Sequence, residues 1–265
     1  MEDLPKGLAQ SGAIEVAENL RKISGGKVLD VATQKGGFID VLIKALKDYD
    51  DFIGIDIKFE DLESMKKEYE NKPVKFLEMN AEDMEFKDDS FDTVSLSHSL
   101  HHLSNIDKAL KEIKRVLKPD GTFIVQEPFS DGEQSEAQKV DILQSHLNSE
   151  IDNLLGIFHN NTFSKEKIKE IFHKLEFKGA NIYESTHYVK CLFCEDKFKC
   201  EDPKNQDIIN FAIKEMDRDI KRLELETVKD NPDAIRLKEE GERIKKRIHE
   251  IGVSSASNLY FIGKT

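Results

Sequence analysis

The sequence contains no tryptophan and only three cysteines and six prolines among its 265 residues. It has no apolar run approaching the roughly 20 residues that a membrane-spanning helix requires. Acidic residues outnumber basic ones by 52 to 40, which gives a formal net charge of −12. A broad surface that binds phosphate groups needs clustered Lys and Arg, so we expect no nucleic-acid partner and no membrane partner.

The chain begins with Met-Glu-Asp-Leu-Pro-Lys, which has neither the basic nor the apolar region of a secretory signal. We therefore expect a cytoplasmic protein. Its length is enough for one large α/β domain and an additional element.

A strand, a glycine turn and a helix follow one another near the start of the chain. Val28, Leu29 and Val31 indicate a short buried strand, and Asp30 adds a carboxylate near its end. The Gly-Gly turn at residues 36–37 lets the backbone approach a ligand closely. This order is typical of the first unit of a nucleotide-binding α/β fold, which binds ligands at the carboxyl ends of its strands.

A second strand, residues 52–56, ends in Asp56, about twenty residues after the glycine turn. Nucleotide-binding folds place an acidic side chain here to hold the two ribose hydroxyls. Hydrogen bonds to a charged carboxylate are stronger than neutral ones. The spacing therefore predicts a ribose-binding role for Asp56.

Six segments now support a resemblance to a known family. They are Val28-Leu-Asp-Val-Ala, Ile55-Asp, Asn80-Ala-Glu-Asp-Met-Glu-Phe, Ser90-Phe-Asp-Thr-Val, Leu100-His-His-Leu and Val116-Leu-Lys-Pro-Asp-Gly-Thr. In order and spacing the chain resembles class I S-adenosylmethionine-dependent methyltransferases, of the group that includes the menaquinone and ubiquinone C-methyltransferases. The resemblance implies an α/β, Rossmann-like sheet of seven strands with an antiparallel last strand, S-adenosylmethionine as cofactor and a small-molecule methyl acceptor.

The resemblance also implies which residues hold the cofactor. Asp30 would hold its methionine end, Asp56 its ribose, and Asn80 with Ala81 its adenine. The other residues expected around the cofactor are Ala32, Gln34, Gly36, Ile57, Glu82 and Ser97.

One part of the chain departs from the family pattern. Where the family has Gly-x-Gly-x-Gly, this chain has Ala32-Thr-Gln-Lys-Gly36. Three interpretations follow for Gln34, which replaces the middle glycine. The loop takes a different path, or Gln34 and Lys35 contact the carboxylate of the cofactor, or cofactor binding is weakened.

Three histidines follow the fourth expected strand in the run Ser97-His-Ser-Leu-His-His102. These histidines are either a structural feature beside the cofactor, or they act as metal ligands or as a general base. His98 is the candidate catalytic residue because it is nearest to the strand end. We expect the substrate pocket to include His102, Glu127 after the fifth strand, and His146 on a long helix over residues 133–158.

The most individual feature is an insertion of about seventy residues between the sixth and seventh strands. It divides the chain into a cofactor-binding core (1–190), an insertion (191–253) and the last strand of the core (254–265). All three cysteines, Cys191, Cys194 and Cys200, lie at its start, with His187 four residues before the first. This Cys3His set predicts a zinc site; reactive thiols and inert cysteines are the alternatives.

Two charged amphipathic helices, 205–229 and 233–251, complete the insertion as a helical hairpin. Both ends of the insertion belong to the ligand-binding edge of the sheet, so we expect it to cap the substrate pocket. The alternative is a homodimer formed through the hairpin. Two other functions remain open: a non-catalytic S-adenosylmethionine sensor, and a methyltransferase for a soft acceptor such as arsenic bound through the cysteines.

Overall fold

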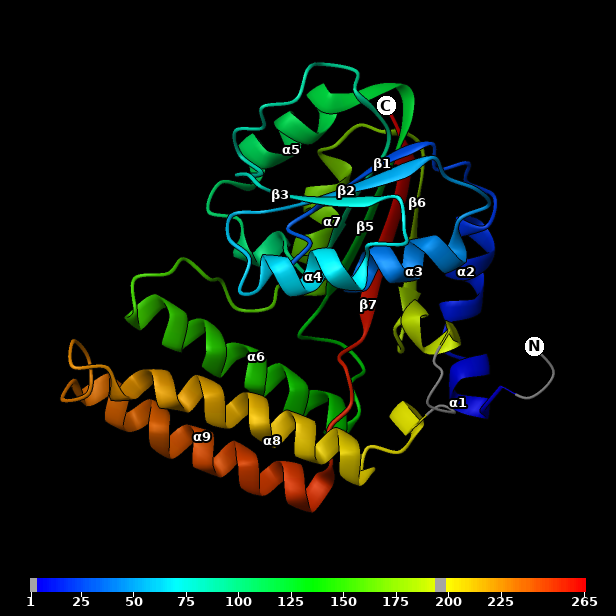
Figure 1. Ribbon diagram of the computed structural model, residues 1–265. Helices are drawn as coiled ribbons and strands as arrows, with labels where there is room; N and C mark the ends of the chain where they lie inside the picture. Colours follow the sequence, from blue (N-terminus) through cyan, green and yellow to red (C-terminus); the bar gives the residue numbers. More distant parts are fainter. Residues whose placement is uncertain (1–3, 194–198) are drawn as a thin grey trace.

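Seven strands form a mixed sheet in the computed structural model, which describes residues 4–193 and 199–265 (Figure 1). The strands are β1 (Lys27–Val31), β2 (Asp51–Asp56), β3 (Val74–Glu78), β4 (Phe91–Ser97), β5 (Leu117–Pro128), β6 (Lys178–Ser185) and β7 (Asn258–Lys264). Their order is β3-β2-β1-β4-β5-β7-β6. Only β7 is antiparallel to its neighbours β5 and β6. The predicted fold class, with an antiparallel last strand, is confirmed.

The centre of the sheet is apolar because both of its faces are covered by helices. In β1, Val28, Leu29 and Val31 have no exposed surface. Leu29 lies opposite Val94 of β4, and Val31 opposite Leu96. Asp30 is therefore a carboxyl group held within the most buried strand of the protein.

Two helices, α5 (Ile106–Val116) and α7 (Lys165–His173), share an apolar core with one face of the sheet. The other face packs against α2 (Ala13–Leu20), α3 (Gly37–Ala45) and α4 (Leu62–Glu68), with the short α1 (Lys6–Ala9) beside α2. The side chain of Asn105 caps α5 by accepting a hydrogen bond from the Lys108 amide at 3.0 Å.

A third apolar core lies outside the sheet, in a bundle of α6 (Glu136–Leu154), α8 (Gln206–Lys221) and α9 (Pro232–Ile251). Figure 1 shows these three helices side by side below the sheet. Gly241 permits the close packing of α9 on α8, since a Cβ there would lie 2.5 Å from Ile220 Cδ1. The long helix expected before the sixth strand, α6, thus packs with the hairpin of the insertion.

The described part of the insertion also contains the short 3-10 turns η2 (Val189–Phe193), which begins just before it, η3 (Lys199–Glu201) and η4 (Arg222–Glu224). A further 3-10 turn, η1 (Leu100–His102), follows β4. The Val253 amide donates to the Pro203 carbonyl at 3.0 Å, so the two ends of the helical hairpin meet. Within the described ranges, no helix combines the length and the apolarity needed to cross a bilayer.

Candidate active site

Asp30 is a deeply buried acidic group near the carboxyl edge of the sheet, with 1% of its surface exposed. The hydroxyls of Ser95 and Thr33 each donate to its carboxylate at 2.6 Å. Burial raises the pKa of Asp30 from 3.8 to about 6, although the two hydroxyl donors oppose the shift. This carboxyl group is thus held in a fixed position facing the start of the next loop.

That loop has left-handed backbone at three positions although it keeps only the last glycine of the family pattern. Ala32, Gln34 and Gly36 have φ angles of 54°, 45° and 76°, all in the left-handed region. The Gln34 amide donates to Asp56 Oδ2 at 2.9 Å, which ties the loop to the end of β2. The departure from Gly-x-Gly-x-Gly therefore changes the side chains and not the left-handed backbone conformation.

Beyond β2 and β3 lie the residues expected at the ribose and the adenine. Ile57 directly follows Asp56 and is 75% exposed. Asn80 accepts from the Glu82 amide through its side chain at 2.9 Å, and Ala81 is buried beside it. The Glu82 carboxylate accepts from the Ser104 hydroxyl and the Asn105 amide, which lowers its pKa and anchors it to the start of α5. Glu82 is thus held by α5, and the adenine-binding role of Asn80 and Ala81 stays a prediction.

His98 follows Ser97 at the end of β4 in a strained backbone conformation, with φ at 52°. Its amide donates to the Gln126 carbonyl at 2.8 Å, and its Nε2 lies 3.2 Å from Gln126 Nε2. The amide NH2 of Gln126 then donates to Nε2, so Nδ1 carries the proton and donates to the Tyr188 hydroxyl oxygen, 3.3 Å away. Burial lowers the pKa of His98 to about 4, so the ring is neutral near pH 7.

Two connected hollows lie along this edge. A crevice of about 240 Å³ is lined by Asp30, Gln34, Ser97 and His98 among others. A larger cleft of about 790 Å³ lies beside it. Val41, Tyr188 and Lys190 line both. The cleft is also walled by α8, through Ile208, Phe211, Ala212 and Met216. Sequence reasoning missed Tyr188 because nothing local marks a residue after β6 as a neighbour of β4.

The residues expected in the substrate pocket lie in different environments. His102 lines the large cleft, and burial together with His101 and His159 lowers its pKa to about 3. Glu127 has no exposed surface; its carboxylate accepts from the amides of Ser99 and Leu100. Glu127 therefore supports the turn after β4 and makes no surface available to a substrate.

His146 is not among the residues that line the cleft, although its helix neighbours Gln144 and Ser145 are. Burial lowers its pKa. The periodicity of α6 predicted an apolar side correctly but not the direction in which His146 points.

Two of the cysteines, Cys191 and Cys200, line the large cleft and form no disulfide. A hydrogen bond with Cys191 lowers the pKa of the Cys200 thiol to about 7. His187 places Nε2 3.0 Å from the Glu201 carboxylate and Nδ1 3.1 Å from the Thr186 hydroxyl. Cys194 lies outside the described residues, and the zinc site stays a prediction.

The fold and the edge of the sheet can now be compared with known proteins. Residues 29–125 match the family model described as a methyltransferase domain. This stretch is similar to a methyltransferase domain. It contains the end of β1, the glycine-type loop, Asp56 and the histidine run after β4.

Similarity to curated proteins is confined to part of the chain. The ubiquinone/menaquinone biosynthesis C-methyltransferase UbiE of Rickettsia prowazekii is 38% identical over 109 residues, which cover 38% of this chain and 43% of that protein. The chain thus matches less than half of that relative. The insertion lies beyond the residues that match the family model.

Solved structures show the same fold over nearly the whole chain. A methyltransferase described as putative from Bacillus halodurans has a TM-score of 0.53 at 17% identity and covers 95% of this chain and 96% of its own. The phosphoethanolamine N-methyltransferase 2 of Haemonchus contortus, solved with S-adenosylhomocysteine, has a TM-score of 0.51 at 16% identity, covering 96% and 52%. At such identities the similarity establishes the fold of the methyltransferase domain and not its acceptor.

Proposed function

We propose that this protein transfers a methyl group from S-adenosylmethionine to a small-molecule acceptor held in the large cleft. The observation that carries the proposal is the junction of the two hollows at Val41, Tyr188 and Lys190. A cofactor in the crevice and an acceptor in the cleft would meet there. A volume of about 790 Å³ is within the usual range for small-molecule sites.

The residues at the edge of the sheet fit S-adenosylmethionine by their chemistry. Asp56 keeps lone pairs free for ribose hydroxyls beyond its bond from the Gln34 amide. Asp30, held by two hydroxyls, offers a negative site for the positively charged methionine end. Asn80 and Ala81 follow β3 where the adenine is expected. The bound cofactor supplies the reactive methyl group.

The protein contributes orientation and exclusion of water. His98 and Tyr188 form a hydrogen-bonded pair beside the junction. A neutral imidazole with a pKa near 4 is a weak base, so this pair fits positioning of the acceptor better than removal of its proton. The side chains of α8 complete the wall, which supports the role of the insertion as a cap over the acceptor.

The test is a two-step measurement. Isothermal titration with S-adenosylmethionine comes first, followed by detection of S-adenosylhomocysteine release with a panel of phenols, quinols, thiols and amines. We expect binding, and turnover with one acceptor class. Tyr188→Phe should raise the KM for the acceptor while Tyr183→Phe, five residues away on β6, should not. Cofactor binding without turnover on any class would instead favour the sensor function.

A soft acceptor such as arsenic is the second candidate, because Cys191 and Cys200 line the same cleft. The lowered pKa of Cys200 increases its thiolate fraction near neutral pH. Including arsenite in the acceptor panel, with Cys200→Ser as the variant, separates this candidate from the first.

A further inference from the structure

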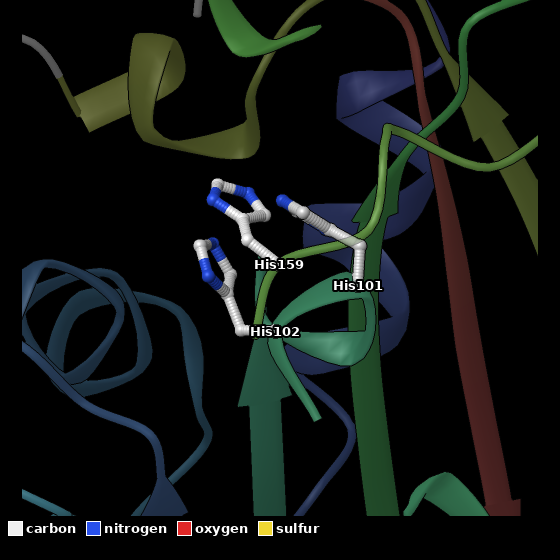
Figure 2. A group of neighbouring side chains, drawn as sticks. All are labelled: His101, His102 and His159. Atoms are coloured by element: carbon white, nitrogen blue, oxygen red, sulfur yellow. The ribbon is translucent and has the colours of Figure 1, made fainter. Parts of the chain in front are cut away.

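Three imidazole rings from distant parts of the chain meet at the wall of the large cleft. His101 and His102 belong to η1, and His159 comes from the segment after α6. One ring nitrogen from each lies within 4.8 Å of the others. Figure 2 shows the three rings gathered together, with ring centroids 4.0–5.4 Å apart. The Asn160 amide donates to the His101 carbonyl at 2.9 Å, which fixes the two segments together.

Two of the rings are oriented by buried carboxylates. His101 Nδ1 lies 2.5 Å from Glu127 Oε1, and His159 Nδ1 lies 2.6 Å from Asp152 Oδ2. A carboxylate at Nδ1 holds the proton there and leaves the lone pair of Nε2 free. Histidine ligands of metal ions have this same support from a carboxylate on the far ring nitrogen.

His159 provides a second, independent observation. Its side chain is 3% exposed, and its Nε2 atom is buried without a hydrogen-bond partner. Leaving a buried polar atom unsatisfied is unfavourable, and such atoms are uncommon in folded proteins. Packing alone gives no reason to direct this nitrogen toward two other imidazoles, whereas a shared cation would satisfy it.

The ligand set restricts the identity of the cation. Three imidazole nitrogens suit zinc and related transition metals, whereas magnesium and calcium prefer oxygen ligands. Three histidines with a fourth position left open are the pattern of catalytic zinc sites. Zn–N distances of about 2.1 Å in a tetrahedral site place the nitrogens about 3.4 Å apart, so the present nitrogens, all within 4.8 Å of one another, would have to approach by roughly 1.4 Å at most.

We propose that His101, His102 and His159 bind one zinc ion whose fourth coordination position faces the large cleft. All three residues line that cleft. Asp152 and Glu127 act as positioning residues for two of the ligands. Asp152 is in turn paired with Arg222 of η4, so the insertion contributes to the support of the site.

The open position indicates the class of acceptor, an inference that rests on the proposed function. A phenol, enol or thiol would form a metal–oxygen or metal–sulfur bond and release its proton to solvent. A bound cation lowers the pKa of such a ligand, as it does for water. The acceptor would thereby become nucleophilic without a basic side chain, in keeping with the positioning role of His98.

The metal site is tested by adding zinc to chelator-treated protein in an isothermal titration. We expect one equivalent to bind to the wild-type protein, and at least a 10-fold loss of affinity in His102→Ala and His159→Ala. His102 is partly exposed, so its variant should fold, which circular dichroism and thermal unfolding verify. His173→Ala, an exposed histidine at the end of α7, is the matched control. Equal affinity in wild type and His102→Ala would overturn the proposal.

Cobalt substitution separates the histidines from the cysteines. Cobalt bound by imidazoles gives visible d–d bands and no thiolate charge-transfer band in the near ultraviolet. We expect this spectrum to persist in a Cys191→Ser, Cys200→Ser double variant. A charge-transfer band that vanishes in the double variant would place the metal at the cysteines instead and overturn the proposal.

The role of the zinc ion in activating the acceptor is tested by a separate measurement. Affinity for S-adenosylmethionine should be equal with and without zinc, and turnover of phenols or thiols should need zinc. If the cofactor does not bind, the proposed function fails while the zinc titration still decides the metal site. If metal-free protein turns over at the full rate, the acceptor role is wrong although the histidines bind zinc.

Discussion

The two halves of the ligand-binding edge differ in chemistry and in construction. Around β1 and β2 the polar groups are carboxylates, and Asp30 and Asp56 are joined by one short loop. Around β4 and β5 lies a group of imidazoles from the end of β4, from η1 and from the segment after α6, and the hydroxyl of Tyr188 pairs with one of them. The first half is built from residues near in sequence and the second from residues far apart.

This difference matches the two ligands that we propose. A shared cofactor needs the same few contacts in every family member, and a local strand–loop–helix unit supplies them. An acceptor specific to this protein needs side chains brought together by the whole fold. Changes in the first half should therefore alter cofactor binding or stability, and changes in the second should alter the acceptor.

The largest expected effect is on stability and concerns Asp30. Its folded-state pKa of about 6 lies above the ordinary 3.8, a difference worth about 3 kcal/mol. The contribution of protonated Asp30 to the stability of the folded state is fully present below pH 3.8 and is lost as the pH rises through 6. Asp30→Asn should therefore be about 3 kcal/mol more stable than wild type at pH 7.5 in urea unfolding, with no gain near pH 4.

Asp51→Asn is the control for this measurement, because Asp51 is exposed at the opposite end of β2. It should follow the wild-type pH profile. The stability difference between Asp30→Asn and wild type should be larger at pH 7.5 than at pH 4. An equal difference at the two pH values would show that burial does not control the pKa of this carboxyl group. The same variant should bind S-adenosylmethionine more weakly, a stability gain at the expense of function.

Asp56→Ala should weaken the binding of S-adenosylmethionine by about 2 kcal/mol, or roughly 30-fold, by removing a charged acceptor from the ribose. Isothermal titration measures the loss. The exposed Asp51→Ala at the start of the same strand should bind normally. Unchanged affinity in Asp56→Ala would mean that the ribose is held elsewhere. The assignment of the cofactor to the β1–β2 half would then be wrong.

Phe211→Ala should act in the opposite half. Phe211 is 66% exposed and lines both the large cleft and the hollow beside Asp56. Losing its apolar contact should raise the KM for the acceptor several-fold, about 1 kcal/mol, with little change in thermal stability. Ile235→Ala, also exposed but on α9, is the control. An unaltered KM would argue against α8 as a wall of the acceptor site.

The smallest effect should come from Gln34→Gly. The left-handed φ of 45° is unfavourable for glutamine and free of strain for glycine. Relief of strain is partly offset by the greater freedom of glycine in the unfolded chain, so a gain of at most about 1 kcal/mol is expected. Cofactor affinity should be equal or better. A large loss of affinity would identify the Gln34 side chain as a cofactor ligand.

The sheet and the cofactor half were predictable because their signals are local. The alternation of strands and helices, the turn at residues 36–37 and the strand-end acids each lie within a few residues of one another. Tyr188 and His159 were not predicted, since each reaches its partners only after long segments fold. Glu127 was expected at the substrate and instead supports η1. A sequence does not show whether a buried carboxylate will bind a ligand or accept hydrogen bonds from the protein's own donors.

The meeting of Pro203 with Val253 has a consequence for engineering. Residues 204–252 leave and rejoin the chain at one point, so they can be exchanged without changing the strand order. The apolar face of α6 would have to be exchanged with them, since Val140, Leu147 and Ile151 belong to the same core. The transplantable unit is therefore a three-helix module, and under the proposed function grafting it onto another scaffold of this fold should change the acceptor.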